Sequence, residues 1–462
     1  MNVEVLARVQ FALTIGFHYI YPPMSIGIGL MLVLFEAKFL ATGNAIYEKA
    51  TRFWLSIFAL VFGMGVATGI IMEFEFGTNW ASYSRYVGDV FGSALSAEGI
   101  FAFALESGFL GILLFGWNRV GRKTHFFSTV MVFLGSCFSA VWIVVANSWQ
   151  QTPAGYHIVG EGLKARAEVT DFWAMVFNPS SMVRLLHVWT GGFLAGAFFV
   201  LSVSAWYLVR RRFEPIARPM FKAALVVATF FSLFQLFMGD RSASLVARYQ
   251  PAKLASMEGH YDSFAVADMY LGGFVDNRRE EVKGLKIPGG LSFLVYHDFK
   301  KPVTGLHAFR PEDRPSQVNT IFQCYHLMIV IGMAIIGLTL LACFFWWRKK
   351  LFDHRWLLWA FVPGVALPEL ANLSGWFTAE IGRQPWVVYG MLRTSDAFSK
   401  QVRANQIIFS LILFLVVYAL LFVLFIYLLN KKIVKGPEEA NLRQKYLQSP
   451  LRDNPLLHAG RP

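Results

Sequence analysis

The sequence has few charged residues for its length. They make up 15% of its 462 positions, whereas hydrophobic residues make up 56%. A globule of this size needs far more polar side chains to cover its surface, so the composition excludes a soluble protein. The chain is predicted to be a polytopic membrane protein.

Cysteine is also scarce. Cys137, Cys324 and Cys343 all lie in apolar segments, and none belongs to a C-x-x-C or C-x-x-C-H pattern. Their placement excludes a disulfide framework and covalent haem attachment. The net charge of +13 would suggest nucleic acid in a soluble chain. In a membrane protein basic residues first mark cytoplasmic loops, and no nucleic-acid-binding motif is present.

Apolar runs long enough to cross about 30 Å of hydrocarbon dominate what is present. The nine runs lie at about 10–35, 53–74, 93–117, 125–147, 183–208, 220–239, 319–346, 355–374 and 406–430. The first run contains His18 and Pro22-Pro23 and lacks a small-residue cleavage site, so we interpret it as a retained helix. The expected fold is an all-α integral membrane protein with nine transmembrane helices.

The loop charges predict an orientation. Lysine and arginine clusters follow runs one, three, five, seven and nine, whereas the short loop after run two has only Arg85 against Asp89. The positive-inside rule then places the N-terminus outside and the C-terminus in the cytoplasm. The expected parts are helices one to six (1–238), an outer loop (239–318), helices seven to nine (319–430) and a cytoplasmic tail (431–462).

The outer loop is unusually long, and long loops in compact proteins are usually functional or disordered. Its stretch Tyr249–Glu258 has a proline at a plausible helix start, and Lys253 and Glu258 lie about a turn apart. A short surface helix with a solvated charge pair is one interpretation, and a binding site is the other.

The stretch Gly375–Trp386 places a carboxylate, a guanidinium and two indoles directly after an apolar helix. Glu380 could ligate or neutralise a metal, Arg383 suits carboxylates, and Trp376 offers a large rigid surface for a flat cofactor. A haem has the matching parts: an iron, two propionates and a wide apolar ring. A membrane-interface loop with an aromatic belt and one salt bridge is the alternative.

Ionisable and soft-ligand residues inside apolar runs are costly, which makes them functional candidates. His18 lies four residues before Pro22-Pro23, which should distort the helix and leave room beside it. His187 lies early in run five, and Met328 lies early in run seven. His326 and Met328 are two residues apart on one helix, so both cannot reach one iron. A His and Met pair saturates haem iron and suits electron transfer.

Run three carries two further carboxylates. Glu98 and Glu106 are about 12 Å apart along an α-helix that runs from outside to inside. Buried carboxylates without a basic partner are pushed toward neutrality, which suits proton relay or metal ligation.

Several long motifs occur in one order along the chain. They include Phe17-His18-x-x-Tyr21-Pro22, Met72-Glu73-Phe74-x-Phe76-Gly77-Thr78-Asn79-Trp80, Glu98-Gly99 with Glu106-Ser107, Ala146-Asn147-x-Trp149, Gln250-Pro251-Ala252-Lys253-Leu254-Ala255 with Glu258, and Gly375-Trp376-x-x-x-Glu380-x-Gly382-Arg383-Gln384-Pro385-Trp386. Together they resemble subunit I of the cytochrome bd family of quinol oxidases.

The resemblance implies a role for each candidate residue. His187 and Met328 would ligate a low-spin haem b, and His18 and Glu380, with Glu98 nearby, would serve two high-spin haems. Arg383 and Trp376 would contact haem, and Glu106 would be on the proton route. Lys253 and Glu258 would contribute to quinol oxidation in the outer loop, which becomes the quinol loop.

The resemblance also implies a respiratory oxidase of the bacterial cytoplasmic membrane. It would oxidise quinol at the outer face and reduce oxygen to water at a high-spin haem pair, generating proton motive force without a copper site. The haem sites would lie toward the outer face. A second integral membrane subunit (subunit II) is implied as partner, small single-helix subunits are compatible with it, and lipids surround the protein.

This sequence departs from better-known relatives at three positions: His326 stands where many have Arg, Glu75 where Gln is usual, and Gln150 where Met follows the Trp. With its short quinol loop, the pattern most resembles the cyanide-insensitive branch. The second high-spin group is then either haem d or a further b-type haem. A secondary transporter with a midplane His and Glu relay is a competing hypothesis, which predicts inverted repeats that are not found here.

Overall fold

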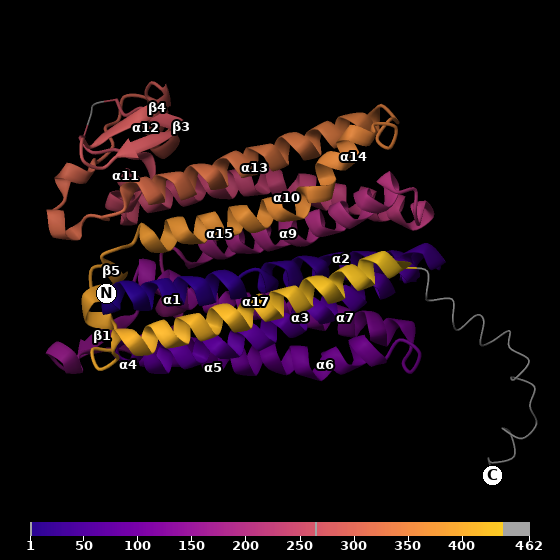
Figure 1. The fold of residues 1–462 in the computed structure, drawn as a ribbon, viewed down its shortest axis with the longest axis horizontal. Helices are drawn as coiled ribbons and strands as arrows, with labels where there is room; N and C mark the ends of the chain where they lie inside the picture. Colours follow the sequence, from indigo (N-terminus) through magenta and orange to yellow (C-terminus); the bar gives the residue numbers. More distant parts are fainter. Residues whose placement is uncertain (1, 264–265, 438–462) are drawn as a thin grey trace, which may run out of the picture.

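The computed structural model describes residues 2–263 and 266–437, in which long helices run side by side along one axis (Figure 1). Nine helical segments within these residues are long and apolar enough to cross a membrane, as predicted. They contain α1 (Val3–His18), α2 (Tyr21–Thr42), α3 (Ala45–Thr78), α5 (Gly88–Glu98), α6 (Ala104–Phe115), α7 (Arg122–Gln151), α9 (Ser181–Val209), α10 (Glu214–Tyr249), α13 (Val318–Trp347), α14 (Arg355–Phe361), α15 (Ala366–Ile381) and α17 (Ala404–Lys435).

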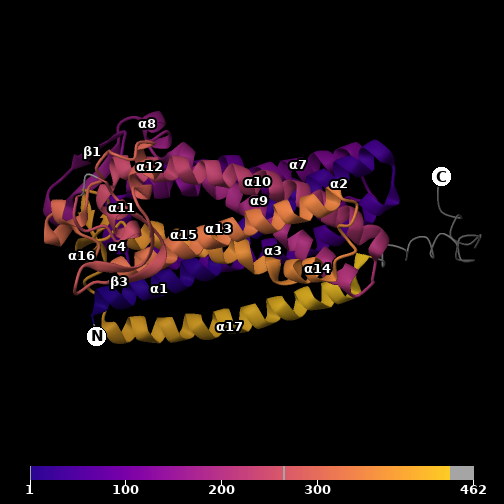
Figure 2. The same ribbon diagram turned by 90° about the horizontal axis from the view of Figure 1, so that it is seen from above.

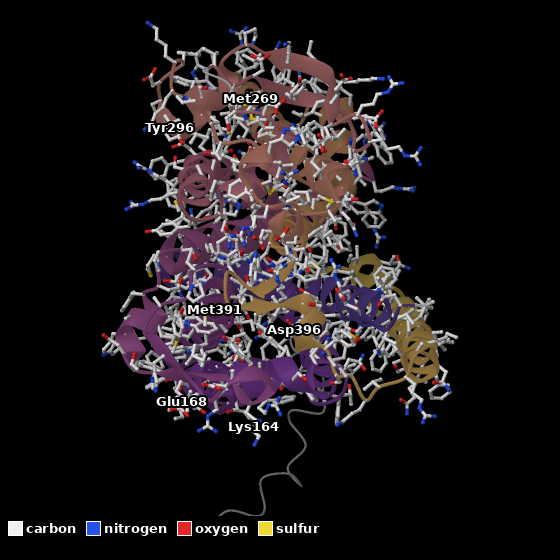
Figure 3. All side chains as sticks on the ribbon, turned by 90° about the vertical axis from the view of Figure 1, so that its left-hand side faces the viewer. Lys164, Glu168, Met269, Tyr296, Met391 and Asp396 are labelled. Carbon is white, nitrogen blue, oxygen red and sulfur yellow. The ribbon has the colours of Figure 1, made fainter. Side chains whose placement is uncertain are left out.

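Short elements gather mainly at one end of this bundle, on the left in Figure 1. The helical ones are α4 (Ala81–Tyr86), α8 (Phe172–Val176), α11 (Pro251–Glu258), α12 (Gly290–Tyr296) and α16 (Thr394–Ala397). Three antiparallel pairs are β1 (Tyr156–Val159) with β2 (Arg166–Val169), β3 (Met269–Asp276) with β4 (Glu281–Ile287), and β5 (Trp386–Val388) with β6 (Leu392–Arg393). Figure 3 looks onto this end, with Met269 and Tyr296 on one side and Lys164 and Glu168 on the other.

The first span is two helices rather than the single helix expected at 10–35. α1 ends at His18, and α2 begins at Tyr21 with prolines in its first turn. Proline lacks a backbone N–H and is tolerated at a helix start, so Pro22-Pro23 begin α2 instead of lying inside one helix. The expected distortion beside His18 is confirmed.

The third span also departs from a continuous α-helix. Residues Gly99–Phe103, between Glu98 and Glu106, form a π-helix. Eight residues of α-helix would leave these two side chains about 80° apart around the axis. The wider π turn reduces this angle, and both carboxylates reach serines of α7.

Helix α9 occupies the centre of the bundle and is buried along most of its length (Figure 2). It contacts α2 through glycines: a Cβ on Gly27 would lie 2.2 Å from the carbonyl oxygen of Gly192, and one on Gly196 would lie 2.1 Å from the carbonyl carbon of Gly27. Such distances leave no space for a larger side chain. The Gly192-x-x-x-Gly196 pattern of α9 thus allows the close approach of α2.

The expected outer loop begins later than predicted, because α10 continues to Tyr249 instead of ending near 239. The segment that follows is folded: α11 packs on α13, and β3–β4 and α12 form small apolar clusters with it. Lys253 and Glu258 are buried, with 4% and 1% of their surface exposed. A solvated charge pair on a surface helix is therefore wrong for this stretch.

The chain enters and leaves the bundle at opposite ends, as an odd number of spans requires. Helix α1 begins beside the short elements, and α17 ends at the other end (Figure 1). α17 extends to Lys435, so the first residues of the expected tail at 431–462 are helical. Residues 438–462 of that tail lie outside the described residues.

Candidate functional site

A cavity of about 1520 Å³ lies inside the bundle, larger than the pockets of about 300–1,000 Å³ that usually hold one small ligand. Nine of the ten candidate residues from the sequence line it, namely His18, Glu98, Glu106, His187, Lys253, Met328, Trp376, Glu380 and Arg383. Glu258 lies outside the lining. The fold thus gathers side chains from eight of the nine helical spans and from the outer segment around one space.

His187 and Met328 face this cavity from α9 and α13. Within the described chain, Nδ1 of His187 is buried and has no hydrogen-bond partner. Met328 has room because its neighbour on α15 is Gly375: a Cβ there would lie 2.8 Å from the methionine sulfur. A buried unpaired imidazole and a thioether in a glycine notch fit the two axial ligands of a haem.

His326 has a different environment. Its Nδ1 lies 2.8 Å from the carbonyl oxygen of Phe322, and its Nε2 lies 2.8 Å from that of Tyr270. Both ring nitrogens are occupied by backbone, and the residue does not line the cavity. His326 therefore joins α13 to β3 and is not free to ligate metal.

His18 lies at the end of α1, beside the break before α2. Its Nδ1 is 2.9 Å from the hydroxyl of Thr68, which itself donates to the carbonyl oxygen of Met64. The hydroxyl must then accept from Nδ1–H, which leaves the lone pair of the imidazole on Nε2. Histidines that bind metals are usually oriented in this way by a bond to the other nitrogen. Gly69 makes room for the ring, since its Cβ would lie 3.3 Å from Cε1 of His18.

Glu98 and Glu106 share a single neighbour helix. The hydroxyl of Ser139 donates to Glu98 at 2.5 Å, and that of Ser136 donates to Glu106 at 2.7 Å. The two serines are three residues apart on α7 and lie on one face of it. Both carboxylates line the cavity, and each is 8% exposed. The two acids therefore form a row along α7 in the wall of the cavity.

Glu380 is held by a network of polar side chains at the end of α15. Asn147 donates to its Oε1 at 3.0 Å, Gln151 donates to the same oxygen at 3.4 Å, and Arg383 is hydrogen-bonded to Oε2. Arg184 joins the network through Asn147 and through Ser148 at 3.1 Å. The membrane-interface loop considered for this stretch is wrong, because Arg383 is buried and the network faces a cavity.

Lys253 extends the network from α11. Its Nζ donates to Oε1 of Gln151 at 2.5 Å. Burial, together with repulsion from Arg184 and Arg383, holds the pKa of Lys253 well below its usual range, and attraction to Glu380 opposes this. When these groups are ionised, three cations face one carboxylate, leaving two positive charges in excess. That excess suits the two propionates of a haem.

Glu258 lies at the last residue of α11 and is 1% exposed. Burial raises its pKa to about 8, and interaction with the hydroxyl of Tyr325 opposes that rise. Among the residues that the structure describes, neither carboxylate oxygen has a partner of normal hydrogen-bond geometry. A carboxyl group in this state can gain or lose a proton near neutral pH.

Trp376 lines the cavity one residue after the glycine notch, and its ring centroid lies 5.1 Å from that of Phe377. These rings give the cavity an apolar surface against which a flat group can pack. Sequence reasoning missed Gln151, which joins Lys253 to Glu380, and the serines that hold the two acids of the third span. In the sequence these residues are visible only as polar positions within run four and shortly after it. The sequence alone does not indicate which side chains they would bond to.

Comparison with known proteins agrees with this geometry. The family described as "Cytochrome bd terminal oxidase subunit I" matches residues 6–437. The chain is 38% identical to the cytochrome bd ubiquinol oxidase subunit 1 of Bacillus subtilis, with 96% of each chain covered. It is 34% identical to the cytochrome bd-II ubiquinol oxidase subunit 1 of Escherichia coli, covering 96% of this chain and 98% of the relative.

A solved structure is similar as well. The bd oxidase from Geobacillus thermodenitrificans superposes with a TM-score of 0.86 at 28% identity, covering 94% of this chain and 99% of the other. The likeness spans both the bundle and the outer segment. The chain therefore belongs to the cytochrome bd terminal oxidase subunit I family.

Proposed function

We propose that this chain is the quinol-oxidising and oxygen-reducing subunit of a terminal respiratory oxidase in the bacterial cytoplasmic membrane. The observation that carries this proposal is the single cavity that His18, His187, Met328 and Glu380 all line. Family membership decides against the competing transporter hypothesis.

Haem is the cofactor of the family, and when bound it supplies electron transfer and the site of oxygen reduction. We assign His187 and Met328 to a low-spin haem b. His18 and Glu380, with Glu98 nearby, are assigned to a high-spin haem b and to a second high-spin group that is haem d or a further b-type haem. Arg383 and Trp376 would contact haem, and Arg184 and Lys253 would neutralise its propionates.

Quinol oxidation is assigned to α11 and its surroundings. A quinol must lose two protons as it loses two electrons, and Glu258 can accept a proton near neutral pH. Lys253 is buried near the start of α11, and its ammonium group donates a hydrogen bond to Gln151 at the cavity wall. Glu258 lies five residues after Lys253 on the same short helix, and Lys253 lines the cavity in which haem would bind.

Oxygen reduction consumes protons, and the row formed by Glu106, Ser136, Ser139 and Glu98 is the route that we assign to them. These groups hold protons at successive positions along α7 in the wall of the cavity. With quinol protons released outside and these protons drawn from the cytoplasm, the reaction generates proton motive force by charge separation and without copper.

The orientation follows from the loop charges, with the N-terminus and the quinol loop (239–318) outside and the C-terminus in the cytoplasm. Subunit I implies a second integral subunit, subunit II. The apolar side chains exposed along α17, including Phe409, Ile412 and Val416, must be covered by lipid or by protein. Small single-helix subunits are compatible with this arrangement.

The purified complex tests the proposal directly. We expect reduced-minus-oxidised haem absorbance, extractable non-covalent haem, and oxygen consumption driven by a quinol. Extraction identifies the macrocycles, which decides between haem d and a further haem b. A preparation without haem absorbance would overturn the proposal.

A further inference from the structure

A second cavity, of about 600 Å³, lies far from the haem site at the opposite end of the bundle, where α13 turns into α14 (Figure 1). Its walls come from the first turns of α10, the last turn of α13 and the loop that follows. The lining residues are Arg218, Lys222, Cys343, Trp346, Trp347, Lys349, Leu351 and Phe352. Nothing in the oxidase reaction uses this cavity.

All the charged residues that line this cavity are cations. Arg218 is paired with Glu214 at 2.9 Å, whereas Lys222 and Lys349 form no ion pair within the described part of the chain. Lys349 has a left-handed φ of 58°. This backbone conformation favours glycine, so the backbone of the turn does not explain why a lysine stands at this position. Two uncompensated ammonium groups beside a guanidinium form a site for an anion.

Aromatic side chains make the same cavity amphipathic. Nζ of Lys222 lies 5.5 Å from the ring of Trp346 and 5.7 Å from that of Phe352, and the guanidinium of Arg218 lies 5.0 Å from the latter ring. Trp347 is exposed beside them. Tryptophans with cations at a helix end are typical of the level of lipid headgroups.

Exposed apolar side chains continue from the cavity toward the middle of the span. Val226 and Phe230 follow Lys222 at four-residue intervals on α10, and Leu340 and Phe344 flank Cys343 on α13. A free inorganic anion would gain no favourable contact from these apolar side chains. An acyl chain would cover them while its phosphate meets the cations.

We propose that this cavity, lined by Arg218, Lys222 and Lys349, binds the phosphate of an anionic phospholipid whose acyl chains lie along α10 and α13. The loop that closes the cavity is anchored, since Leu351 is buried and the ring of Phe352 packs edge-on against Phe221 at 5.8 Å. The site is therefore formed before the lipid arrives.

The test compares the purified complex carrying wild-type chain with the double variant Lys222→Gln/Lys349→Gln. Lys350→Gln is the matched control, because this neighbouring exposed lysine does not line the cavity. Each complex is equilibrated with vesicles of phosphatidylglycerol and phosphatidylcholine, and native mass spectrometry measures the retained lipids. Haem content and oxygen consumption verify that the variants are folded.

We expect wild type and the control to retain an additional phosphatidylglycerol, whose occupancy falls roughly tenfold or more in the double variant. Phosphatidylcholine should not replace it, and millimolar inorganic phosphate should not displace it. Equal phosphatidylglycerol retention in all three complexes would overturn the proposal. Loss in the Lys350 control, equal retention of phosphatidylcholine, or displacement by inorganic phosphate would each also overturn it.

Discussion

The sulfur of Met328 lies 2.8 Å from the point where a side chain on Gly375 would begin. The two residues come from α13 and α15, which pack closely against each other. The methionine can occupy this position only because the facing residue on α15, Gly375, has no side chain. The low-spin haem site that we propose thus depends on a residue that makes no bond to iron.

Substitution at this contact should change the low-spin haem. Gly375→Val should displace Met328 and reduce the low-spin reduced signal strongly, and His187→Ala and Met328→Leu should remove it while some high-spin absorbance remains. Optical spectra of the reduced variants measure this. Gly337→Ala on α13 is the control, because a Cβ there meets nothing within 4 Å. Normal low-spin spectra in His187→Ala and Met328→Leu would contradict the ligand assignment.

Glu258 should limit quinol oxidation in a pH-dependent way. Its pKa of about 8 means that only about a tenth is ionised at pH 7, so a role as base predicts a quinol-driven rate that rises between about pH 6 and 9. Glu258→Gln should lower that rate roughly 10- to 100-fold and abolish the rise. Turnover with an artificial reductant that bypasses the outer segment should change far less. Equal losses with both donors would indicate a structural role.

Glu106 should deliver protons for oxygen reduction. Glu106→Gln keeps the shape and can still bond to Ser136 but lacks an exchangeable acid, so oxygen consumption should fall roughly 100-fold with haem content nearly intact. Glu75→Gln is a matched control: Glu75 is a buried carboxyl bonded to Thr14 at 2.9 Å that does not line the cavity. Full oxygen consumption and normal voltage generation by Glu106→Gln in proteoliposomes would rule out an obligatory relay.

The outer segment should loosen as pH rises. His307 bridges Asp262 at 2.5 Å and Glu280 at 2.7 Å, and these hydrogen bonds raise its pKa above 6.5. A raised histidine pKa gives stability that is present below the ordinary value and lost as pH rises through the folded value. Amide protection factors of β3–β4 near Glu280, which correct the exchange rate for its intrinsic base catalysis, should therefore be lower at pH 9 than at pH 6.

The same experiment contains its own controls. Asp268 and Lys286 form a 2.6 Å pair near the other end of the hairpin, and their pKa values are shifted apart, lowered for the acid and raised for the base. That pair stays ionised over this range, so the protection factors nearby should change less with pH. His307→Gln should remove the difference near Glu280. An unchanged pH effect in this variant would show that another group causes it.

The sequence by itself determined the membrane class and the nine spans, and it indicated nine residues that line the cavity. Hydrophobic length decides whether a segment can cross a bilayer, and this property is local in sequence. The break beside His18 was predictable for the same reason, since proline acts on its own helix. Long ordered motifs then indicated the family, because their residues are spaced along the chain as the family's are.

Tertiary structure alone decided how those residues meet. The π turn at Gly99–Phe103 directs Glu98 and Glu106 to one face of α7, Gln151 joins Lys253 to Glu380, and Gly375 leaves space for Met328. The burial of Glu258, and with it its raised pKa, likewise depends on how α11 packs against α13. Each of these relationships either joins residues on different elements or depends on the local winding of a helix. The hydrophobic pattern of a sequence specifies which face of a helix is buried, but not which neighbouring element that face contacts.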